Sequence, residues 1–268
     1  MPEPEASACQ DAICEPYLAV ALVTGAASGI GAATVRAIAK RCSGLAVHTR
    51  GSSPESRKRL EAVAESARAD GADVLVLDGD LAEPGTGRRL IEATLGRFGR
   101  LDHLVANAGF ADRRRTAALT RADLDRSLAT MAGAFFELAQ AATDTLKSSR
   151  QGRIIYLSSF VAHRYAQGAL FPASAAAKSA GEALMRTLAA ELAPAGVTVN
   201  AVVPGYTRKD GGHTALGSDA WKAAAAVTPL GRIGEPGDIA ALIAFLLSPS
   251  ARHITGQAIA VDGGLSLG

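Results

Sequence analysis

Short apolar runs alternate with longer amphipathic segments along almost the whole chain. The apolar runs are rich in Val, Ile and Leu and are hydrophobic at successive positions, as strands covered on both faces of a sheet are. They lie at residues 18–24, 45–49, 73–77, 101–106, 153–158, 197–203 and 258–261. Helical segments lie between them, at residues 30–41, 54–70, 85–98, 121–147, 173–192 and 238–247. This order predicts one α/β domain, a doubly wound parallel sheet of about seven strands with helices on both faces.

The composition narrows the class of protein. Apolar residues make up 48% of the chain and charged residues 20%, so a sizeable core is expected. The 28 basic and 26 acidic side chains are interspersed and give a net charge of +2, which predicts no basic face for nucleic acid or for an anionic membrane. The most apolar later segment, residues 239–247, is about half of the ~18 residues that a membrane helix needs. We therefore expect neither a nucleic-acid nor a membrane partner.

The two remaining compositional signals concern the chain start and the cysteines. Residues 1–16 are acidic and lack an apolar run long enough for a signal peptide, so we expect a flexible tail before a domain over residues 17–268. The three cysteines, at positions 9, 14 and 42, are odd in number and lack the spacing of a zinc site. These features favour a reduced, cytoplasmic chain with no metal site.

A glycine-rich turn, TGAASGIG at residues 24–31, follows the first apolar run and leads directly into a helix. Gly25 permits a tight turn, Gly29 lets backbone approach a pyrophosphate, and Gly31 lets the helix pack close to the strand. The free N–H groups and positive dipole end of that helix can receive a phosphate. The turn is typical of a Rossmann-type dinucleotide site, and its predicted cofactor-binding residues are Gly25, Ser28, Gly29, Ile30 and Gly31.

The end of the second apolar run bears on the choice between NAD and NADP. An acidic residue there would bind the adenosine ribose of NAD, but residues 48–53 read HTRGSS and contain no carboxylate. Arg50, with the hydroxyls of Ser52 and Ser53, could instead hold a 2′-phosphate through charge-assisted hydrogen bonds. The sequence therefore favours NADP(H), and the alternative is that Arg50 is a solvated residue at a strand end.

Several further motifs occur in a fixed order along the chain. They are DL at residues 80–81, ANAG at 106–109, SS at 158–159, PG at 204–205 and DGG at 262–264. Together with the glycine turn they resemble the short-chain dehydrogenases/reductases, and within them the 3-oxoacyl-ACP reductase-like enzymes, from residue 17 to the C-terminus. The resemblance implies a substrate loop over residues 206–227. It also implies that the cofactor is lined by Asp80, Leu81, Asn107, Ala108, Gly109, Lys178, Pro204, Gly205 and Thr207.

The catalytic positions depart from the family pattern. The resemblance implies a serine, a tyrosine, a lysine four residues after the tyrosine, and an asparagine in an earlier helix. Ser159 and Lys178 match the serine and the lysine, but the tyrosine position holds Ser174 and the asparagine position holds Thr130. An aliphatic hydroxyl is a far weaker acid than a phenol and is also one ring shorter, so Ser174 does not replace tyrosine in kind.

Tyr165 is the best candidate proton donor that the sequence offers. It lies in the loop 160–171, between Ser159 and the helix that carries Lys178. The 2,4-dienoyl-CoA reductases of the same superfamily also have serine at the tyrosine position and take their tyrosine from earlier in this loop. The alternative is that Tyr165 is a surface aromatic, while Ser174 could relay a proton through water.

Four functions stay open at this point. The leading hypothesis is an NADP(H)-dependent oxidoreductase that transfers a hydride to the carbonyl of a 3-oxoacyl or ketone-like substrate. The alternatives are reduction of a conjugated C=C bond in an acyl thioester, a catalytically impaired nucleotide-binding partner subunit, and a deliberate tyrosine-to-serine knockout. Relatives form dimers and tetramers through their long helices, so we expect a homodimer or homotetramer, with a hetero-oligomer as the alternative.

Overall fold

The computed structural model describes residues 18–166, 169–208 and 218–267. Its seven strands form one parallel sheet in the order β3-β2-β1-β4-β5-β6-β7, which confirms the predicted doubly wound topology. The strands are β1 (Ala19–Val23), β2 (Cys42–Thr49), β3 (Asp73–Asp78), β4 (His103–Ala106), β5 (Arg153–Leu157), β6 (Thr198–Pro204) and β7 (Ala258–Val261).

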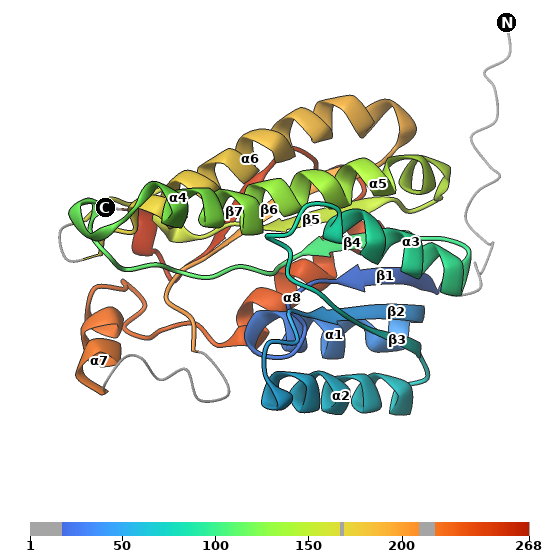
Figure 1. Cartoon of the computed structure of the whole chain (residues 1–268), viewed down its shortest axis with the longest axis horizontal. Coiled ribbons are helices and arrows are strands. Elements are labelled where there is room, and N and C mark those ends of the chain that lie inside the picture. The colour runs from blue at the N-terminus through green and yellow to red at the C-terminus, as the bar shows by residue number, and fades with distance from the viewer. Residues whose placement is uncertain (1–17, 167–168, 209–217, 268) are drawn as a thin grey trace, which may run out of the picture.

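Helices cover both faces of the sheet (Figure 1). One face carries α1 (Gly29–Ile38), α2 (Pro54–Ala69) and α8 (Pro236–Leu246), and the other carries α3 (Thr86–Phe98), α5 (Ala134–Ser148) and α6 (Pro172–Leu192). The short helix α4 (Arg121–Leu128) packs beside α6. Each face has its own apolar core, as a sheet buried on both sides requires.

Two predicted segments show additional detail in the structure. The helix expected over residues 121–147 is present as one continuous helical run in which a π-helical turn at Ala129–Gly133 joins α4 to α5. The predicted substrate loop 206–227 contains a helix, α7 (Ser218–Ala226). The expected tail 1–16 and residues 209–217 lie outside the described residues.

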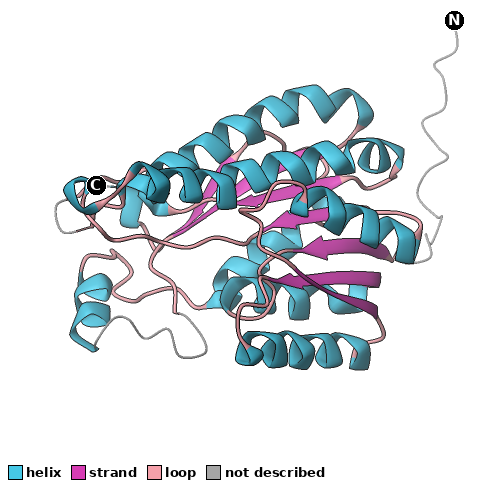
Figure 2. Ribbon diagram, in the orientation of Figure 1, coloured by secondary structure: helices cyan, strands magenta, loops and turns pink. Residues whose placement is uncertain are grey.

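The topology places the chemistry at one edge of the sheet. All strands run in parallel, so their carboxyl ends share an edge, and in Figure 2 the strand arrows point toward the side where α7 and the long loops lie. The chain moves outward in one direction from β1 to β3 and then crosses back to β4 on the other side of β1. Ligands bind at this kind of switch point, so the turns after β1 and β4 define the expected cofactor crevice.

In the part of the chain that the structure describes, no helix combines the length and hydropathy that crossing a membrane requires. Those same residues hold no group of three or more His, Cys, Asp or Glu side chains that could bind a metal ion. Cys42 is buried, and burial raises the pKa of its thiol to about 12, so the thiol stays protonated and unreactive.

Candidate active site

Asn107 fixes the glycine turn after β1 to the end of β4. Its Nδ2 donates to the carbonyls of Thr24 (2.8 Å) and Gly25 (3.2 Å). In return, the Thr24 hydroxyl oxygen accepts the backbone N–H groups of Asn107 (3.0 Å) and Ala108 (3.1 Å). Two predicted cofactor segments that lie far apart in the sequence are therefore held as one unit.

The glycines of this turn are required by close approach as well as by backbone conformation. A Cβ on Gly31 would lie 2.2 Å from the Gly25 carbonyl oxygen and 2.6 Å from Asn107 Nδ2. Gly25 has φ +66° and Gly29 has φ +55°, the left-handed region that glycine adopts without strain. The close packing that the sequence predicts at Gly31 is therefore present.

The N-terminus of α1 has the properties of a phosphate site. Ser28 is the N-cap residue, and its side chain makes no capping hydrogen bond. The first turn, which includes Ile30, contains no acidic residue, so nothing charged competes for its free N–H groups. These donors and the helix dipole suit the pyrophosphate of a dinucleotide, so the residues present fit this group.

The ends of β2 and β3 supply the predicted adenosine contacts. Arg50 is exposed, and its Nη2 donates to Ser52 Oγ over 3.2 Å. Asp80 accepts hydrogen bonds from Arg126 (2.9 Å) and from the Ala82 N–H (3.0 Å), and these lower its pKa although partial burial opposes them. Leu81 is buried beside this turn. The guanidinium at the end of β2 is compatible with a phosphate on the adenosine ribose.

Lys178 reaches the carboxyl end of β5. Its Nζ donates to the Leu157 carbonyl over 2.5 Å and lies 5.1 Å from the centre of the Tyr156 ring. A Cβ on Gly109 would lie 3.1 Å from the same nitrogen, so the turn after β4 also approaches it. Burial lowers the pKa of the ammonium to about 8, while the charge of Glu182 opposes the shift. Lys178 is therefore largely charged at neutral pH.

A buried carboxylate anchors the turn that carries Ser159. Ser159 caps the short helical turn Phe160–Ala162, and Glu182 lies one turn after Lys178 on α6. Glu182 Oε1 accepts the Ser158 hydroxyl (2.5 Å) and contacts His163 Nε2 (2.6 Å), which tethers both ends of the turn. Sequence reasoning missed Glu182, although its spacing of four from the predicted lysine places both residues on one helix face.

Ser174 has a structural task in this site. Its side chain is 1% exposed, and its Oγ accepts the Asp112 N–H over 2.9 Å. The same hydroxyl lies 3.5 Å from the Phe110 carbonyl. Ser174 therefore anchors the loop after Gly109 to the start of α6, and no hydrogen bond among the described residues joins its hydroxyl to Ser159 or Lys178.

Two further predicted catalytic residues, Tyr165 and Thr130, make no hydrogen bond to Ser159 or Lys178 among the described residues. Tyr165 is 66% exposed, and its hydroxyl donates to the Ala162 carbonyl over 2.8 Å. Thr130 lies in the π-helical turn, and its hydroxyl is buried with no hydrogen-bond partner among the described residues. The structure thus brings Ser159, Lys178 and Ser174 to one end of the sheet but gives Tyr165 a surface position.

The segment after β6 is fixed against the segment after β7. Pro204 ends β6, and a Cβ on Gly205 would lie 2.7 Å from Asp262 Cα. The Gly205 N–H donates to the Val261 carbonyl (3.1 Å), and the Thr207 hydroxyl donates to the Gly205 carbonyl (3.1 Å). The backbone of residues 204–207, which the sequence predicts to face the nicotinamide, is therefore held in place by the end of β7.

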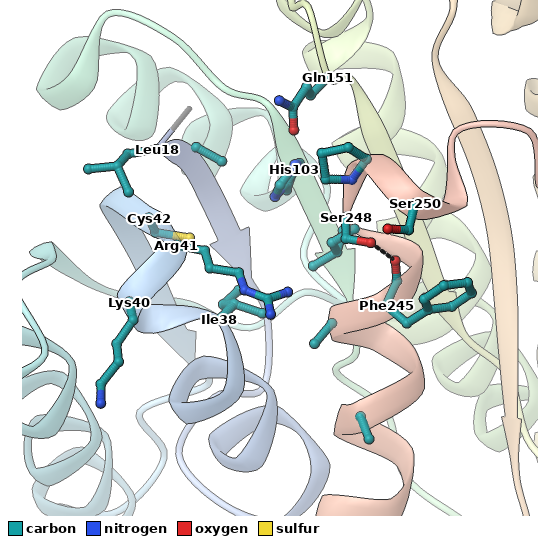
Figure 3. A pocket seen from close by; sticks show the side chains of 15 residues that line it. Leu18, Ile38, Lys40, Arg41, Cys42, His103, Gln151, Phe245, Ser248 and Ser250 are labelled. Atoms are coloured by element: carbon teal, nitrogen blue, oxygen red, sulfur yellow. Dashed lines mark hydrogen bonds between the residues drawn. The ribbon is translucent and has the colours of Figure 1, made fainter. Parts of the chain in front are cut away.

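A cavity of about 660 Å³ lies at the opposite, amino-terminal edge of the sheet (Figure 3). It is lined by Leu18, Cys42, His103 and Phe245 among others, and none of the predicted site residues borders it. Burial lowers the pKa of His103 to about 4, so its imidazole is neutral. This cavity is distinct from the site at the carboxyl edge.

Comparisons with known proteins agree with this geometry. The family described as Enoyl-(Acyl carrier protein) reductase matches residues 25–266. The 3-oxoacyl-[acyl-carrier-protein] reductase FabG of Staphylococcus aureus is 36% identical over 246 residues, covering 91% of this chain and 97% of that protein.

Two solved structures that resemble the chain contain a nicotinamide dinucleotide phosphate. A short-chain dehydrogenase from Burkholderia cenocepacia in complex with NADP has a TM-score of 0.85 at 32% identity, covering 94% of this chain and 99% of that one. A blue fluorescent protein from a metagenomic library, in complex with NADPH, has a TM-score of 0.85 at 34% identity, covering 92% and 98%.

Proposed function

Because the chain belongs to the short-chain dehydrogenase/reductase family, we propose that it is an NADP(H)-dependent oxidoreductase that reduces the carbonyl of a 3-oxoacyl or ketone-like substrate. The observation that carries this proposal is the dinucleotide turn, in which Asn107 and Gly31 close the backbone around the N-terminus of α1. Because Gly31 and Asn107 approach the Gly25 backbone so closely, the first N–H groups of α1 are held in place, where they can bind a phosphate.

Named residues would hold each part of the cofactor. Ser28 and the first turn of α1 bind the pyrophosphate, and Arg50 with Ser52 binds the 2′-phosphate of the adenosine ribose. Lys178 binds the nicotinamide ribose through its ammonium. Three further groups border the adenine, the dinucleotide and the nicotinamide, respectively: Asp80 and Leu81; Asn107, Ala108 and Gly109; and Pro204, Gly205 and Thr207. The bound cofactor supplies the hydride.

The residues around Ser159 prepare the substrate carbonyl. The Ser159 hydroxyl donates a hydrogen bond to the carbonyl oxygen, which orients the substrate and polarises the C=O bond. The charged Lys178 stabilises negative charge that develops nearby, and burial strengthens this effect because the local dielectric is low. Glu182 keeps the Ser159 turn in place through Ser158 and His163.

The second candidate function is reduction of a conjugated C=C bond in an acyl thioester. It is favoured by the description of the matched family as an enoyl reductase and by the combination of Ser174, Lys178 and a tyrosine in the preceding loop. In this case Tyr165 is the donor that the sequence predicts, and substitution to phenylalanine tests it directly. A catalytically impaired subunit remains an outcome of the experiment below.

The proposed working form is a cytoplasmic homodimer or homotetramer with a small-molecule substrate. Phe136 on α5 is 48% exposed, which is consistent with contact between long helices of two subunits. Its cytoplasmic location rests on the cysteine count, since an odd set of thiols suits a reducing compartment. Sedimentation of the purified protein at several concentrations measures the subunit number.

One titration tests the proposed function. NADPH and NADH are titrated into the purified protein by fluorescence, and ketone, 3-oxoacyl-thioester and enoyl-thioester acceptors are then added to the protein–NADPH mixture. We expect NADPH to bind at least 10-fold more tightly than NADH and to be consumed with the carbonyl acceptors. Consumption only with enoyl thioesters selects the second candidate, and binding without turnover selects the impaired subunit. Absence of NADPH binding refutes the assignment of the glycine turn.

A further inference from the structure

Carbonyl reduction requires a proton at the substrate oxygen, and two candidate hydroxyls are already engaged elsewhere. Ser174 Oγ accepts the Asp112 N–H and directs its own proton to the Phe110 carbonyl (3.5 Å), and its side chain is only 1% exposed. The Tyr165 hydroxyl donates to the Ala162 carbonyl on a side chain that is 66% exposed. A donor has to be a stronger acid than an aliphatic alcohol and has to lie beside Ser159.

Tyr206 lies at the same end of the sheet as Ser159. It is the second residue after the end of β6, just as Ser159 is the second residue after the end of β5, and β5 pairs with β6. The pairing continues past β5, because the Ser158 N–H donates to the Val202 carbonyl over 2.9 Å. The two residues therefore leave neighbouring strands at the same carboxyl edge.

Aromatic contacts then bring the Tyr206 ring to the catalytic turn. Its centre lies 4.6 Å from that of Phe160, the residue that directly follows Ser159, at an interplanar angle of 51°. Phe160 in turn packs edge-on against Phe171, which precedes α6. The Tyr206 ring is therefore part of the apolar cluster between Ser159 and the start of α6.

Backbone contacts hold Tyr206 in this position. The Gly234 N–H donates to the Tyr206 carbonyl over 2.8 Å, and the neighbouring Gly205 is fixed to Val261. The Tyr206 side chain is partly buried, and among the described residues its hydroxyl has no hydrogen-bond partner. A partly buried ring with a phenolic hydroxyl at its tip is suited to contact a substrate.

We propose that Tyr206 is the proton donor of this site, in place of the tyrosine that Ser174 replaces in the family pattern. The inference rests on the proposed carbonyl reduction. It also assigns the substrate carbonyl a position between the Ser159 hydroxyl and the Tyr206 hydroxyl, above the segment Pro204–Thr207.

The proposed step is balanced. The hydride and its electron pair come from the reduced nicotinamide and form a C–H bond at the carbonyl carbon, while the C=O π bond breaks. The developing alkoxide takes the proton of Tyr206 Oη, which leaves a phenolate. Water then returns a proton to the phenolate, so each cycle converts one ketone, one NADPH and one proton into one alcohol and NADP+.

The test compares Tyr206→Phe with Tyr165→Phe in the full-length protein, using the acceptor that the NADPH titration identifies. Tyr206→Phe keeps the ring and its contact with Phe160. We therefore expect the unfolding midpoint to be unchanged and the NADPH affinity to stay within a few-fold of wild type. Turnover should fall by at least about 100-fold, the usual range for loss of a general acid. The same ketone, titrated into the protein–NADP+ complex by calorimetry, should bind several-fold more weakly because a hydrogen bond to its oxygen is lost.

A third variant separates proton donation from packing. Tyr206→His restores a titratable group, and we expect it to recover part of the turnover with the basic limb of the pH profile moved to lower pH. Full turnover in Tyr206→Phe, or a comparable loss confined to Tyr165→Phe, overturns the assignment of Tyr206. Absence of NADPH binding in wild type instead refutes the proposed function, and wild-type binding without turnover on any acceptor overturns the proton-donor assignment while leaving the cofactor site intact.

Discussion

The two halves of the carboxyl edge of the sheet differ in the groups that they present: one presents mainly backbone groups and the other mainly side chains. The half formed by the turns after β1 and β4 presents backbone, because Gly31, Asn107 and the first turn of α1 shape a cradle of N–H groups. The half formed by β5, β6 and the start of α6 presents side chains such as Ser159 and Lys178. A backbone site depends on the shape of the whole turn, whereas a side-chain site depends on a few atoms.

This difference affects how much substitution each half can tolerate. A Cβ on Gly31 would lie 2.2 Å from a backbone oxygen, so a change there is strongly disfavoured as long as a dinucleotide binds. At position 174 a serine hydroxyl instead bonds the Asp112 N–H and stabilises the neighbouring loop. The side chain at position 174 therefore stabilises a loop of this half through one hydrogen bond.

Gly31→Ala should produce the largest loss of NADPH affinity, because it changes the backbone of the glycine turn directly. The new methyl group meets the Gly25 carbonyl and Asn107 Nδ2, so the turn has to open. We expect NADPH affinity to fall by at least about 100-fold, together with a loss of roughly 1–3 kcal/mol in the free energy of unfolding. Fluorescence titration and denaturant unfolding measure these two quantities.

Gly96→Ala is the matched control for that change. Gly96 lies within α3, and a Cβ there meets no atom within 4 Å. Alanine is favoured over glycine inside a helix, so stability should rise by about 0.5–1 kcal/mol with NADPH affinity unchanged. If both variants bind NADPH like wild type, the glycine turn is not the cofactor site.

Lys178→Met should move stability and cofactor affinity in opposite directions. Burial lowers the pKa of this ammonium from the ordinary value of 10.5 to about 8, so the folded protein holds the charge at a cost. Removing it should raise the free energy of unfolding at pH 7 by on the order of 1–3 kcal/mol. NADPH affinity should fall by roughly 10-fold or more, because a charge-assisted hydrogen bond to the ribose is lost.

The pH dependence of unfolding provides an independent check on Lys178. Between pH 8 and 10.5 the unfolded chain keeps the Lys178 proton while the folded chain releases it. The lysine term therefore raises the free energy of unfolding of wild type as pH increases through this window. The difference between Lys178→Met and wild type should shrink over the same range. A constant difference from pH 7 to pH 10.5 contradicts the lowered pKa.

The two halves also differ in how much of their structure the sequence could predict. The sheet, the glycine turn and the place of Lys178 follow from local patterns, because each depends on residues within one strand-turn-helix unit. The partner of Ser174 is 62 residues away in a loop, and the contact between Tyr206 and Phe160 arises only because two strands pair. Neither contact leaves a periodic signal in the sequence.

Tyr165 shows that closeness along the chain is also a poor guide to which groups a side chain contacts. The sequence predicts Tyr165 as the proton donor because it lies between Ser159 and α6 in chain order, and a sequence shows no other kind of proximity. The structure bonds its hydroxyl to the Ala162 carbonyl three residues earlier and leaves the ring exposed. The hydroxyl is therefore bonded to the backbone of its own loop, a contact that order along the chain does not reveal.

Arg50→Gln tests a side-chain contact inside the backbone half. The exposed guanidinium donates to Ser52 Oγ and is the proposed partner of the 2′-phosphate. We expect NADPH affinity to fall by roughly 10-fold while NADH affinity changes little, because a charge-assisted hydrogen bond to phosphate is lost. Arg88→Gln on α3 is the control, since Arg88 lies on a helix away from the end of β2. Equal loss for both nucleotides rules out Arg50 as the discriminating residue.

Ser174→Ala should have the smallest effect, and it decides whether the serine is an anchor or a catalytic group. The change leaves the Asp112 N–H without its partner, so the free energy of unfolding should fall by about 1 kcal/mol and Tm by roughly 2–4 °C. Ser179→Ala removes an exposed hydroxyl from the same helix and should leave Tm unchanged. Because the Ser174 hydroxyl bonds the loop rather than Ser159 or Lys178, turnover should change by only a few-fold. A loss of 100-fold or more at unchanged Tm would assign the Ser174 hydroxyl to catalysis and contradict its role as a structural anchor.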